Sequence, residues 1–353
     1  MYKLDWYIGR TVAMSIGAVL MIILGLDIIF AIVDEMGEMD ADYQTAQAVQ
    51  YIIWTIPSRL YEQLGFSALV GCMVGLGTLA GTSELTVMRA AGVSIGRIAW
   101  AVMKPVLLLI ILGMALAEFV IPVTNQVAES RKAIALGDLD DAGLESGMWM
   151  RDGDEFIHFN AALSGGRLYG ITRYHFDAER ELEWVEFSER AQFAENQWVL
   201  SNSRATRFAE ELVQSDAQKR ASWQTDISPQ LFALVVPLPS DLSPSNLWSY
   251  ARFLDRKNED ASRYWLQFWK KLLQPLTIAS LVMVAISFIF GPLREVTTGL
   301  RVFTGVIVGI VFQTLQDMLG PSSLVFGFPP FIAVMVPILL CFGIGWMLLR
   351  RAR

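Results

Sequence analysis

Side chains suited to catalysis are few in this sequence. Its two histidines, His158 and His175, both fall in strand-like segments, and the chain has no His-x-x-x-His, Cys-x-x-Cys or Gly-x-Ser-x-Gly pattern. No lysine follows a glycine, so the phosphate-binding Walker A loop is missing as well. We therefore expect no catalytic residue, no metal and no bound cofactor in this chain. Both histidines are interpreted as ordinary strand residues at or near a surface.

Carboxylates within long apolar runs are the next candidates, because a charge in hydrocarbon is costly and often marks an ion pathway. Asp27, Glu118 and Asp317 each lie toward one end of such a run. This position near an interface favours contact with water, lipid headgroups or a neighbouring helix. A proton relay through Asp27 or Asp317 is the alternative.

A pair of bases, Lys270 and Lys271, lies at the start of another apolar run, beside Trp265 and Trp269. The tryptophans are typical of a membrane interface. Two ammonium groups there could attract anionic groups of a bound molecule, or extend to ordinary lipid headgroups. We therefore include both lysines, with Asp27 and Asp317, among the candidates for a substrate path.

The apolar content predicts a membrane protein with several spans. Of 353 residues, 54% are hydrophobic and 18% are charged, and the mean hydropathy is +0.42. A helix needs about 20 apolar residues to cross the hydrocarbon core. Six runs approach or meet this length, the second with a helical lead-in: 11–33, 64–80, 98–120, 272–290, 302–319 and 331–349.

Lysine and arginine in the short connections predict the orientation, because such bases stay on the cytoplasmic side. The connection at 34–42 has five acids and no base, and the one at 320–330 has no charge. We place these two outside and both ends of the chain in the cytoplasm. The bases that then face the cytoplasm are Lys3, Arg10, Arg89, Arg97, Lys104, Arg294, Arg301, Arg350, Arg351 and Arg353.

Residues 125–262 form an external insertion of a different kind. They carry 14 Lys and Arg against 23 Asp and Glu, whereas the rest of the chain carries 14 against 12. Such an acidic balance argues against nucleic acid as a partner. Aromatic and β-branched segments separated by turn-like clusters predict antiparallel strands at 147–151, 155–159, 167–176, 182–187 and 197–200. We expect an all-β domain, either a β-sandwich or an open barrel, with helical flanks at 124–136 and 243–264.

Three pairs of glycines lie four residues apart within the runs, a spacing that lets helix backbones approach closely. They are Gly71 and Gly75, Gly77 and Gly81, and Gly305 and Gly309. We interpret them as packing among the chain's own helices.

A short polar helix is predicted between the second and third runs, at about residues 82–94. Thr82 or Ser83 is suited to cap its start, and Glu84 to its positive first turn. Gly92 and Ser94 are suited to its end.

This helix is amphipathic. Leu85, Met88 and Ala91 recur at helical spacing on one face, while Glu84 and Arg89 lie nearer the solvent. One interpretation is a helix that rests on lipid headgroups. The other is a coupling helix that docks into a separate cytoplasmic motor, which an energised function would need because this chain has no ATP site. For that role the candidate residues are Ser83, Glu84, Leu85, Met88 and Arg89.

The segment Ser83-Glu-Leu-Thr-Val-Met-Arg-Ala-Ala-Gly92 resembles the coupling-helix motif of the LptF/LptG permeases. Three other stretches agree: Leu4-Asp-Trp-Tyr-Ile-Gly9, Ser287-Phe-Ile-Phe-Gly-Pro-Leu-Arg294 and Phe326-Gly-Phe-Pro-Pro330. The resemblance covers the whole chain. The first of these stretches, together with 263–275, is closer to the LptG branch than to LptF.

The resemblance implies the membrane half of an ABC transporter that extracts lipopolysaccharide (LPS) from the inner membrane of a bacterium. It implies an LptF-like permease as partner, an LptB-like ATPase dimer that uses ATP and Mg²⁺, and an LptC-like protein that receives LPS from a periplasmic β-jellyroll. Glu84 matches the family's acidic residue in the coupling helix, and Lys271 a basic residue at the outer end of the fourth span. Family lysines just beyond the first span are replaced here by Asp34-Glu-Met-Gly-Glu38.

The predicted division of the chain follows. Residues 1–124 hold spans one to three with the coupling helix, 125–262 the jellyroll-like domain, and 263–353 spans four to six. Two other function classes are weighed. An ion-coupled secondary transporter would have repeats and paired helix breaks near the midplane, and neither is evident in the sequence. A non-transporting scaffold fits the composition but leaves the coupling-helix motif unexplained.

Overall fold

The computed structural model describes residues 2–37, 44–135, 148–163, 167–177, 181–194, 197–209, 212–223, 225, 239–256, 259–291 and 296–351. Five of its helices are long and apolar enough to cross a membrane, or six if one bent pair counts as a single span. An antiparallel sheet is inserted between the helices. The predicted fold class, a helical membrane protein with an all-β insertion, is confirmed.

Contacts divide the chain into two compact units. One comprises Met1–Gly37, Ile52–Asn125 and Ser243–Arg353, and the other Glu38–Tyr51 and Gln126–Leu242. The helices of the chain are α1 (Tyr2–Gly37), α2 (Thr45–Glu62), α3 (Leu64–Gly81), α4 (Glu84–Ala90), α5 (Ile95–Ala115), the π-helix η1 (Leu116–Val120), α6 (Ile121–Ala135), α8 (Pro244–Arg256), α9 (Ser262–Leu272), α10 (Gln274–Phe290), α11 (Thr298–Phe326) and α12 (Pro330–Arg351).

The first unit is a helical bundle in which α3 is the most buried span. Its glycines meet α1 at the backbone. A Cβ atom on Gly71 would lie 2.5 Å from the Cα of Ile16, and one on Gly75 would lie 3.0 Å from the Cα of Val12. Glycine is required here because no side chain fits between the two backbones.

The contact between α3 and α11 uses the opposite arrangement. Here the glycines belong to α11, and α3 supplies the bulk. A Cβ atom on Gly305 would lie 2.6 Å from Met73 Sδ, and one on Gly309 would lie 2.6 Å from the ring of Phe66. The interpretation of these two glycine pairs as contacts within the chain is confirmed.

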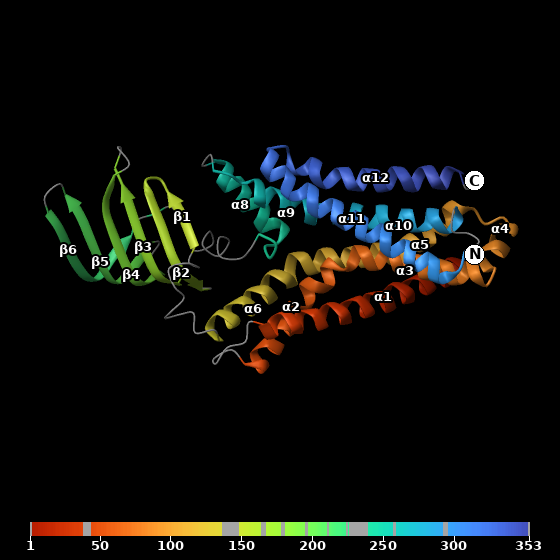
Figure 1. Cartoon of the computed structure of the whole chain (residues 1–353), viewed down its shortest axis with the longest axis horizontal. Coiled ribbons are helices and arrows are strands. Elements are labelled where there is room, and N and C mark those ends of the chain that lie inside the picture. The colour runs from red at the N-terminus through yellow and green to blue at the C-terminus, as the bar shows by residue number, and fades with distance from the viewer. Residues whose placement is uncertain are drawn as a thin grey trace. The chain divides into compact units, whose positions relative to one another are not determined.

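The start of α1, the end of α12 and the short helix α4 lie at the same end of this bundle (Figure 1). The bundle core lies where α1, α3, α5 and α10 pack together, with fully buried side chains such as Val12, Ala68, Met73, Ile98, Val102 and Val282.

Two apolar spans are preceded by helices that meet them at a break. The helix before α3 ends at Glu62, with Gln63 between the two, and α9 meets α10 at Leu273 with a bend of 50°. The second break follows from Pro275, which stands at the start of α10 and cannot continue the hydrogen bonds of α9. Paired helix breaks near the midplane were not evident in the sequence, and these two breaks do not test that expectation.

The described strands form one antiparallel sheet in which each strand pairs with its neighbours along the chain (Figure 1). The strands are β1 (Met148–Asp152), β2 (Glu155–Leu163), β3 (Arg167–Phe176), β4 (Leu182–Ala194), β5 (Gln197–Ala209) and β6 (Leu212–Trp223). Five of them were predicted, β4 and β5 as much shorter segments. The sixth was missed because its sequence is mostly polar, and it forms by pairing along the edge of β5.

The sheet is curled. The hydroxyl of Thr225, just after β6, donates to Asp152 Oδ2 at the end of β1, at 2.6 Å. Gly170 in β3 and Asn202 in β5 have left-handed φ angles of 60° and 55°, which interrupt the regular strand conformation. Among the described strands the domain is therefore a single curled sheet, closer to the open barrel than to the sandwich. Its core residues are Ile157, Phe159, Leu168, Ile171, Ala191, Trp198, Leu200 and Trp223.

Candidate functional site

The short helix α4 is anchored in the bundle by one face. Leu85 is 4% exposed and belongs to the bundle core, and Met88 packs against that core. The opposite side is exposed, including Val87 at 66% and Arg89. Ala91, expected on the apolar face, is exposed because the helix ends at Ala90. The seven residues of α4 thus combine one face that is buried in the bundle with one face that is exposed.

The start of α4 differs from the prediction. Ser83 occupies the N-cap position with a left-handed φ of 63°, and its side chain makes no capping hydrogen bond. The Thr82 hydroxyl instead donates to Glu84 Oε1 at 3.0 Å. The carboxylate of Glu84 is therefore oriented from within the α3–α4 turn. The phenol of Tyr7 on α1 also lies close to this carboxylate.

The end of α4 is a Schellman motif. The Gly92 N–H donates to the Arg89 carbonyl and the Val93 N–H to the Met88 carbonyl, both at 3.0 Å. Gly92 has φ of 87°, which explains why glycine is needed at this position. Ser94 does not end α4 but caps α5, because its Oγ accepts from the N–H of Arg97.

The first turns of α1 are tied to α5 by charge. Asp5 Oδ1 lies 3.2 Å from Arg97 Nε, and Asp5 Oδ2 lies 3.4 Å from Lys104 Nζ. These two bases were expected to face the cytoplasm, but they neutralise a carboxylate between two helices. The corner where α1, α4 and α5 meet is therefore held by the buried side chain of Leu85 and by three polar contacts. These contacts join Tyr7 to Glu84, Asp5 to Arg97, and Asp5 to Lys104.

Asp27 has a partner that the sequence did not reveal. Its Oδ2 lies 3.0 Å from Arg59 Nη1 of α2, and Arg59 Nε donates to the Thr55 hydroxyl at 3.2 Å. Both charges are about a quarter exposed. An ion pair already satisfied in this way favours the interpretation as an anchor between helices.

The two lysines of α9 have different surroundings. Lys270 Nζ lies 4.0 Å from Asp317 Oδ1 of α11, and Asp317 is well exposed. Lys271 is only 8% exposed and is buried within the bundle. The structure therefore brings Lys270 and Asp317 together and keeps Lys271 inside the bundle.

Glu118, the third intramembrane carboxylate, lies in η1. Its carboxylate accepts hydrogen bonds from the N–H and the hydroxyl of Ser245, at the first turn of α8. A π-helical turn widens a helix and is frequent at functional positions. Here it places the carboxylate at the N-terminus of α8, where a negative charge is favoured.

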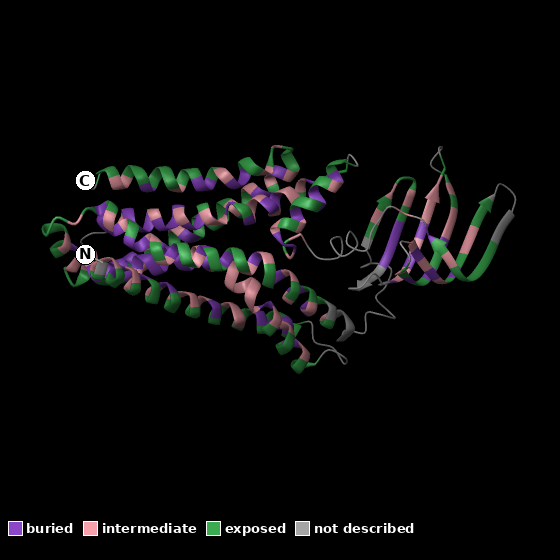
Figure 2. Cartoon of the chain, turned by 180° about the vertical axis from the view of Figure 1, so that it is seen from behind, coloured by how far each residue is buried: buried purple, intermediate pink, exposed green. Residues whose placement is uncertain are grey.

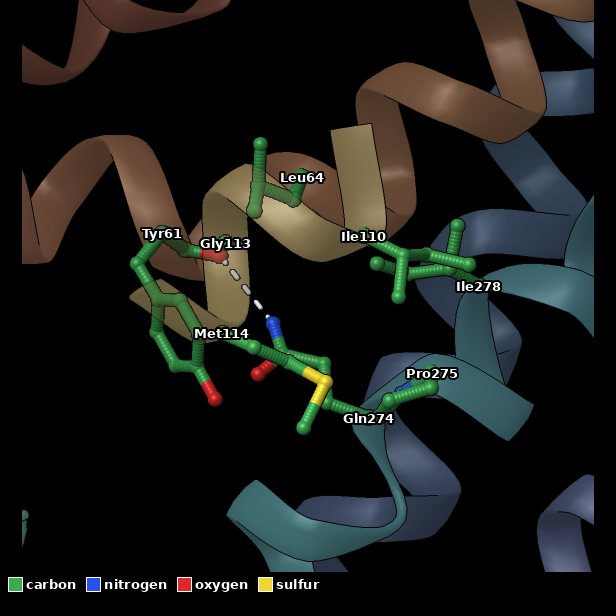
Figure 3. A pocket seen from close by; sticks show the side chains of 8 residues that line it. All are labelled: Tyr61, Leu64, Ile110, Gly113, Met114, Gln274, Pro275 and Ile278. Atoms are coloured by element: carbon green, nitrogen blue, oxygen red, sulfur yellow. Dashed lines mark hydrogen bonds between the residues drawn. The ribbon is translucent and has the colours of Figure 1, made fainter. Parts of the chain in front are cut away.

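A small apolar pocket lies where the two helix breaks face α5 (Figure 3). Gln274 Nε2 donates to the Tyr61 carbonyl at 3.2 Å, so the side chain after one break binds the backbone before the other. A Cβ atom on Gly113 would lie 2.6 Å from Leu64 Cδ1. The two helix breaks are thus fastened to each other and to α5.

Large apolar side chains cover the outside of several spans. Exposed residues follow α12 along most of its length in Figure 2. On α1 and α11 the exposed apolar residues include Met14, Met21, Ile22, Leu26, Ile29, Phe30, Phe303, Ile307, Ile310, Val311 and Met318. Apolar area on this scale needs lipid or a partner helix to cover it.

Arg173 is a buried arginine of the β-domain. Its Nε lies 3.4 Å from Glu155 Oε2 and its Nη1 lies 3.5 Å from Glu186 Oε2. The guanidinium also lies 4.8 Å from the ring centre of Trp184 and 5.3 Å from that of Trp223. Burial raises the pKa of Glu155, and the charge of Arg173 opposes this shift.

The histidines offer no metal site. His158 is buried, contrary to expectation, and burial lowers its pKa so that the ring is neutral at pH 7. His175 stacks on Trp184 with ring centres 5.2 Å apart. Among the residues that the structure describes, no group of three or more His, Cys, Asp and Glu side chains could hold a metal.

Comparison with known proteins gives the same assignment as the motifs. The family model for "Lipopolysaccharide export system permease LptF/LptG" matches residues 6–351. The chain is 33% identical over 353 residues to the lipopolysaccharide export system permease protein LptG of Haemophilus influenzae, covering 99% of both chains. It is 34% identical over 354 residues to LptG of Escherichia coli K12, covering 99% of this chain and 98% of that one. The chain therefore belongs to the LptF/LptG family of lipopolysaccharide export permeases.

Proposed function

We propose that this chain is the LptG-type permease subunit of an ABC transporter, which extracts LPS from the inner membrane and passes it toward the outer membrane. The observation that carries the mechanism is the build of α4, which is anchored in the bundle by Leu85 and exposed on its other side. A separate cytoplasmic ATPase that binds this outer surface could move α4, and the anchor would pass the movement to the spans. Hydrolysis of ATP with Mg²⁺ belongs to that partner.

The proposed assembly contains an LptF-like permease, an LptB-like ATPase dimer and an LptC-like receiving protein. Support for the second permease comes from the exposed apolar side chains of α1 and α11, which are too extensive to be left in water. Support for the orientation comes from α4, the start of α1 and the end of α12, which share one end of the bundle (Figure 1). That end is proposed to be cytoplasmic, and the β-domain periplasmic.

The proposed membrane and periplasmic parts follow the domain boundaries predicted from the sequence. Residues 1–124 and 263–353 would form the membrane part and 125–262 the periplasmic part. LPS has several acyl chains and a phosphorylated head, so its path needs apolar walls and a sheltered groove beyond the membrane. The exposed apolar surfaces of α1 and α11 and the curled sheet are compatible with this requirement.

The test is reconstitution with the ATPase and the second permease in LPS-containing vesicles. We expect no ATP hydrolysis by the isolated chain, and LPS release with hydrolysis by the complete complex. Glu84→Arg is expected to weaken ATPase binding or to uncouple hydrolysis from release, because Glu84 is held at the start of α4. Glu84→Gln, which removes the charge without reversing it, is the matched control with a smaller effect. Hydrolysis by the isolated chain, or normal release by Glu84→Arg, would contradict the proposal.

A further inference from the structure

Arg301 is a basic residue that is buried, although the sequence predicted it to face the cytoplasm. The positive-inside pattern assigns it to a cytoplasmic connection, but in the structure it lies in the first turns of α11 and is only 3% exposed. Its Nη1 donates to the carbonyl of Gly77 on α3 at 2.7 Å. A buried guanidinium in a helical membrane bundle is expensive, and such residues generally have a role beyond packing.

The contact is made against bare backbone. A Cβ atom on Gly77 would lie 3.3 Å from Arg301 Cδ and 3.5 Å from Arg301 Nη1. Gly77 is close to the end of α3 at Gly81, and α4 begins only three residues later, at Glu84. The hydrogen bond therefore joins α11 to the part of α3 that leads directly into α4.

The other contacts between α3 and α11 are of a different kind. Gly305 faces the flexible side chain of Met73, and Gly309 faces the ring of Phe66. Apolar surfaces of this sort can slide past each other by small steps, because dispersion contacts are weak and not directional. The hydrogen bond from the guanidinium to the Gly77 carbonyl is directional, and so it sets the position of α11 along α3.

We propose that Arg301 is a positioning residue that fastens α11 to the α3–α4 corner, so that a displacement of α4 by a docked partner is transmitted to α11. This inference rests on the proposed transport function. The proposed positioning role of Arg301 predicts an effect that a purely structural role would not have. Loss of the contact should separate the movement of α4 from that of α11, while the bundle and the docked partner stay in place.

The first measurement is the amount of LPS released per ATP hydrolysed by the complete complex in vesicles. Arg301→Gln is expected to lower this ratio about tenfold, the factor that corresponds to one hydrogen bond of a charged group. Hydrolysis and ATPase binding should change less than twofold. Arg301→Lys should restore part of the ratio. Arg10→Gln, an exposed base near the start of α1, is the matched control and should leave it unchanged.

The second measurement follows the two helices directly. Spin labels on cysteines at Ala91, directly after α4 and beyond the outer surface around Val87, and at Phe303 of α11, both exposed, report their separation with and without nucleotide. Cys341 is replaced by alanine in this background, and Cys72 is fully buried. In the unaltered protein the two labels should move together. In Arg301→Gln the separation should change with nucleotide, because only α4 then moves.

Gly77→Ala tests the same contact from the other side, since the added methyl group would lie 3.3 Å from Arg301 Cδ and requires that side chain to shift while Arg301 is kept. It is expected to lower the ratio in the same direction, by less than Arg301→Gln, even if Arg301→Gln assembles poorly. An unchanged ratio in both variants, or an equal loss of hydrolysis and release, would overturn the inference. Absence of LPS release by the unaltered complex would instead refute the proposed function.

Discussion

The spans α3 and α11 have similar apolar sequences but very different neighbours. Of the most apolar stretch of each helix, 67% of the residues are buried in α3 and 17% in α11. The first span, α1, is as little buried as α11. Hydropathy therefore identifies all three as membrane helices, but it does not reveal that α3 is the centre on which the other two pack.

The two sides of α3 also differ in how they hold their neighbours. Toward α1 it offers Gly71 and Gly75, and the two backbones touch. Toward α11 it offers the side chains of Met73 and Phe66, which fit over glycines of α11. A backbone contact cannot yield without moving a whole helix, whereas a methionine side chain can change rotamer. We expect α1 to be rigidly attached to α3, and α11 to be the more mobile neighbour along the apolar contacts beyond the Arg301 hydrogen bond.

The largest effect is expected at the backbone contact. Gly71→Ala would place a methyl group 2.5 Å from the Cα of Ile16 and should destabilise the protein by about 3 kcal/mol, the upper range for overpacking. The control is Gly25→Ala on α1, where nothing lies within 4 Å, which should stabilise by about 0.5–1 kcal/mol. Unfolding of the purified protein in detergent measures both. Equal stability of the two variants would remove the distinction between the sides of α3.

A smaller effect is expected on the α11 side. Gly305→Ala would place a methyl group 2.6 Å from Met73 Sδ, but that side chain can move, so the loss should be about 1 kcal/mol. The double variant Gly305→Ala/Met73→Ala removes the clash and separates it from the cavity left by Met73→Ala alone. If Gly305→Ala is as damaging as Gly71→Ala, α11 is held as rigidly as α1.

The ion pair between Asp27 of α1 and Arg59 of α2 tests whether Asp27 anchors the two helices to each other or carries a transported proton. Asp27→Asn should cost at most about 1 kcal/mol, because the pair with Arg59 is partly exposed. LPS release by the reconstituted complex should keep the same dependence on pH between 6 and 8 as the unaltered protein. A pH dependence that disappears in Asp27→Asn would support the proton relay instead.

The smallest effect is expected at the lysines of α9. Lys270→Ala should reduce LPS crosslinking by about fivefold at most, since a base near a membrane surface contributes roughly 1 kcal/mol. Lys271 is buried, so Lys271→Ala should lower stability more than it lowers LPS binding. Thermal unfolding and crosslinking of the single variants and of Lys270→Ala/Lys271→Ala separate the two roles. Equal LPS capture by all of them would make both lysines structural.

Local sequence determined a large part of this protein. Runs of apolar residues located the spans, alternating aromatic segments located five of the six strands that the structure describes, and Gly92 marked the end of α4. These features depend on residues that are close in the chain, since helix ends, strand alternation and span length are local properties. The polar strand β6 was missed because its pairing depends on β5. The helix α4 was likewise predicted from local signals, namely the spacing of its apolar residues and the polar residues at its start.

The partners of the charged side chains were decided only by the tertiary structure. Arg59 and Asp27 are 32 residues apart in the sequence, and Arg301 and Gly77 are 224 apart. The sequence records that a base is present, but its charge is equally compatible with a loop, a lipid headgroup or a neighbouring helix. The choice follows from helix packing, because the glycines of α3 and α11 bring the backbones close enough for one guanidinium to reach a carbonyl across the interface.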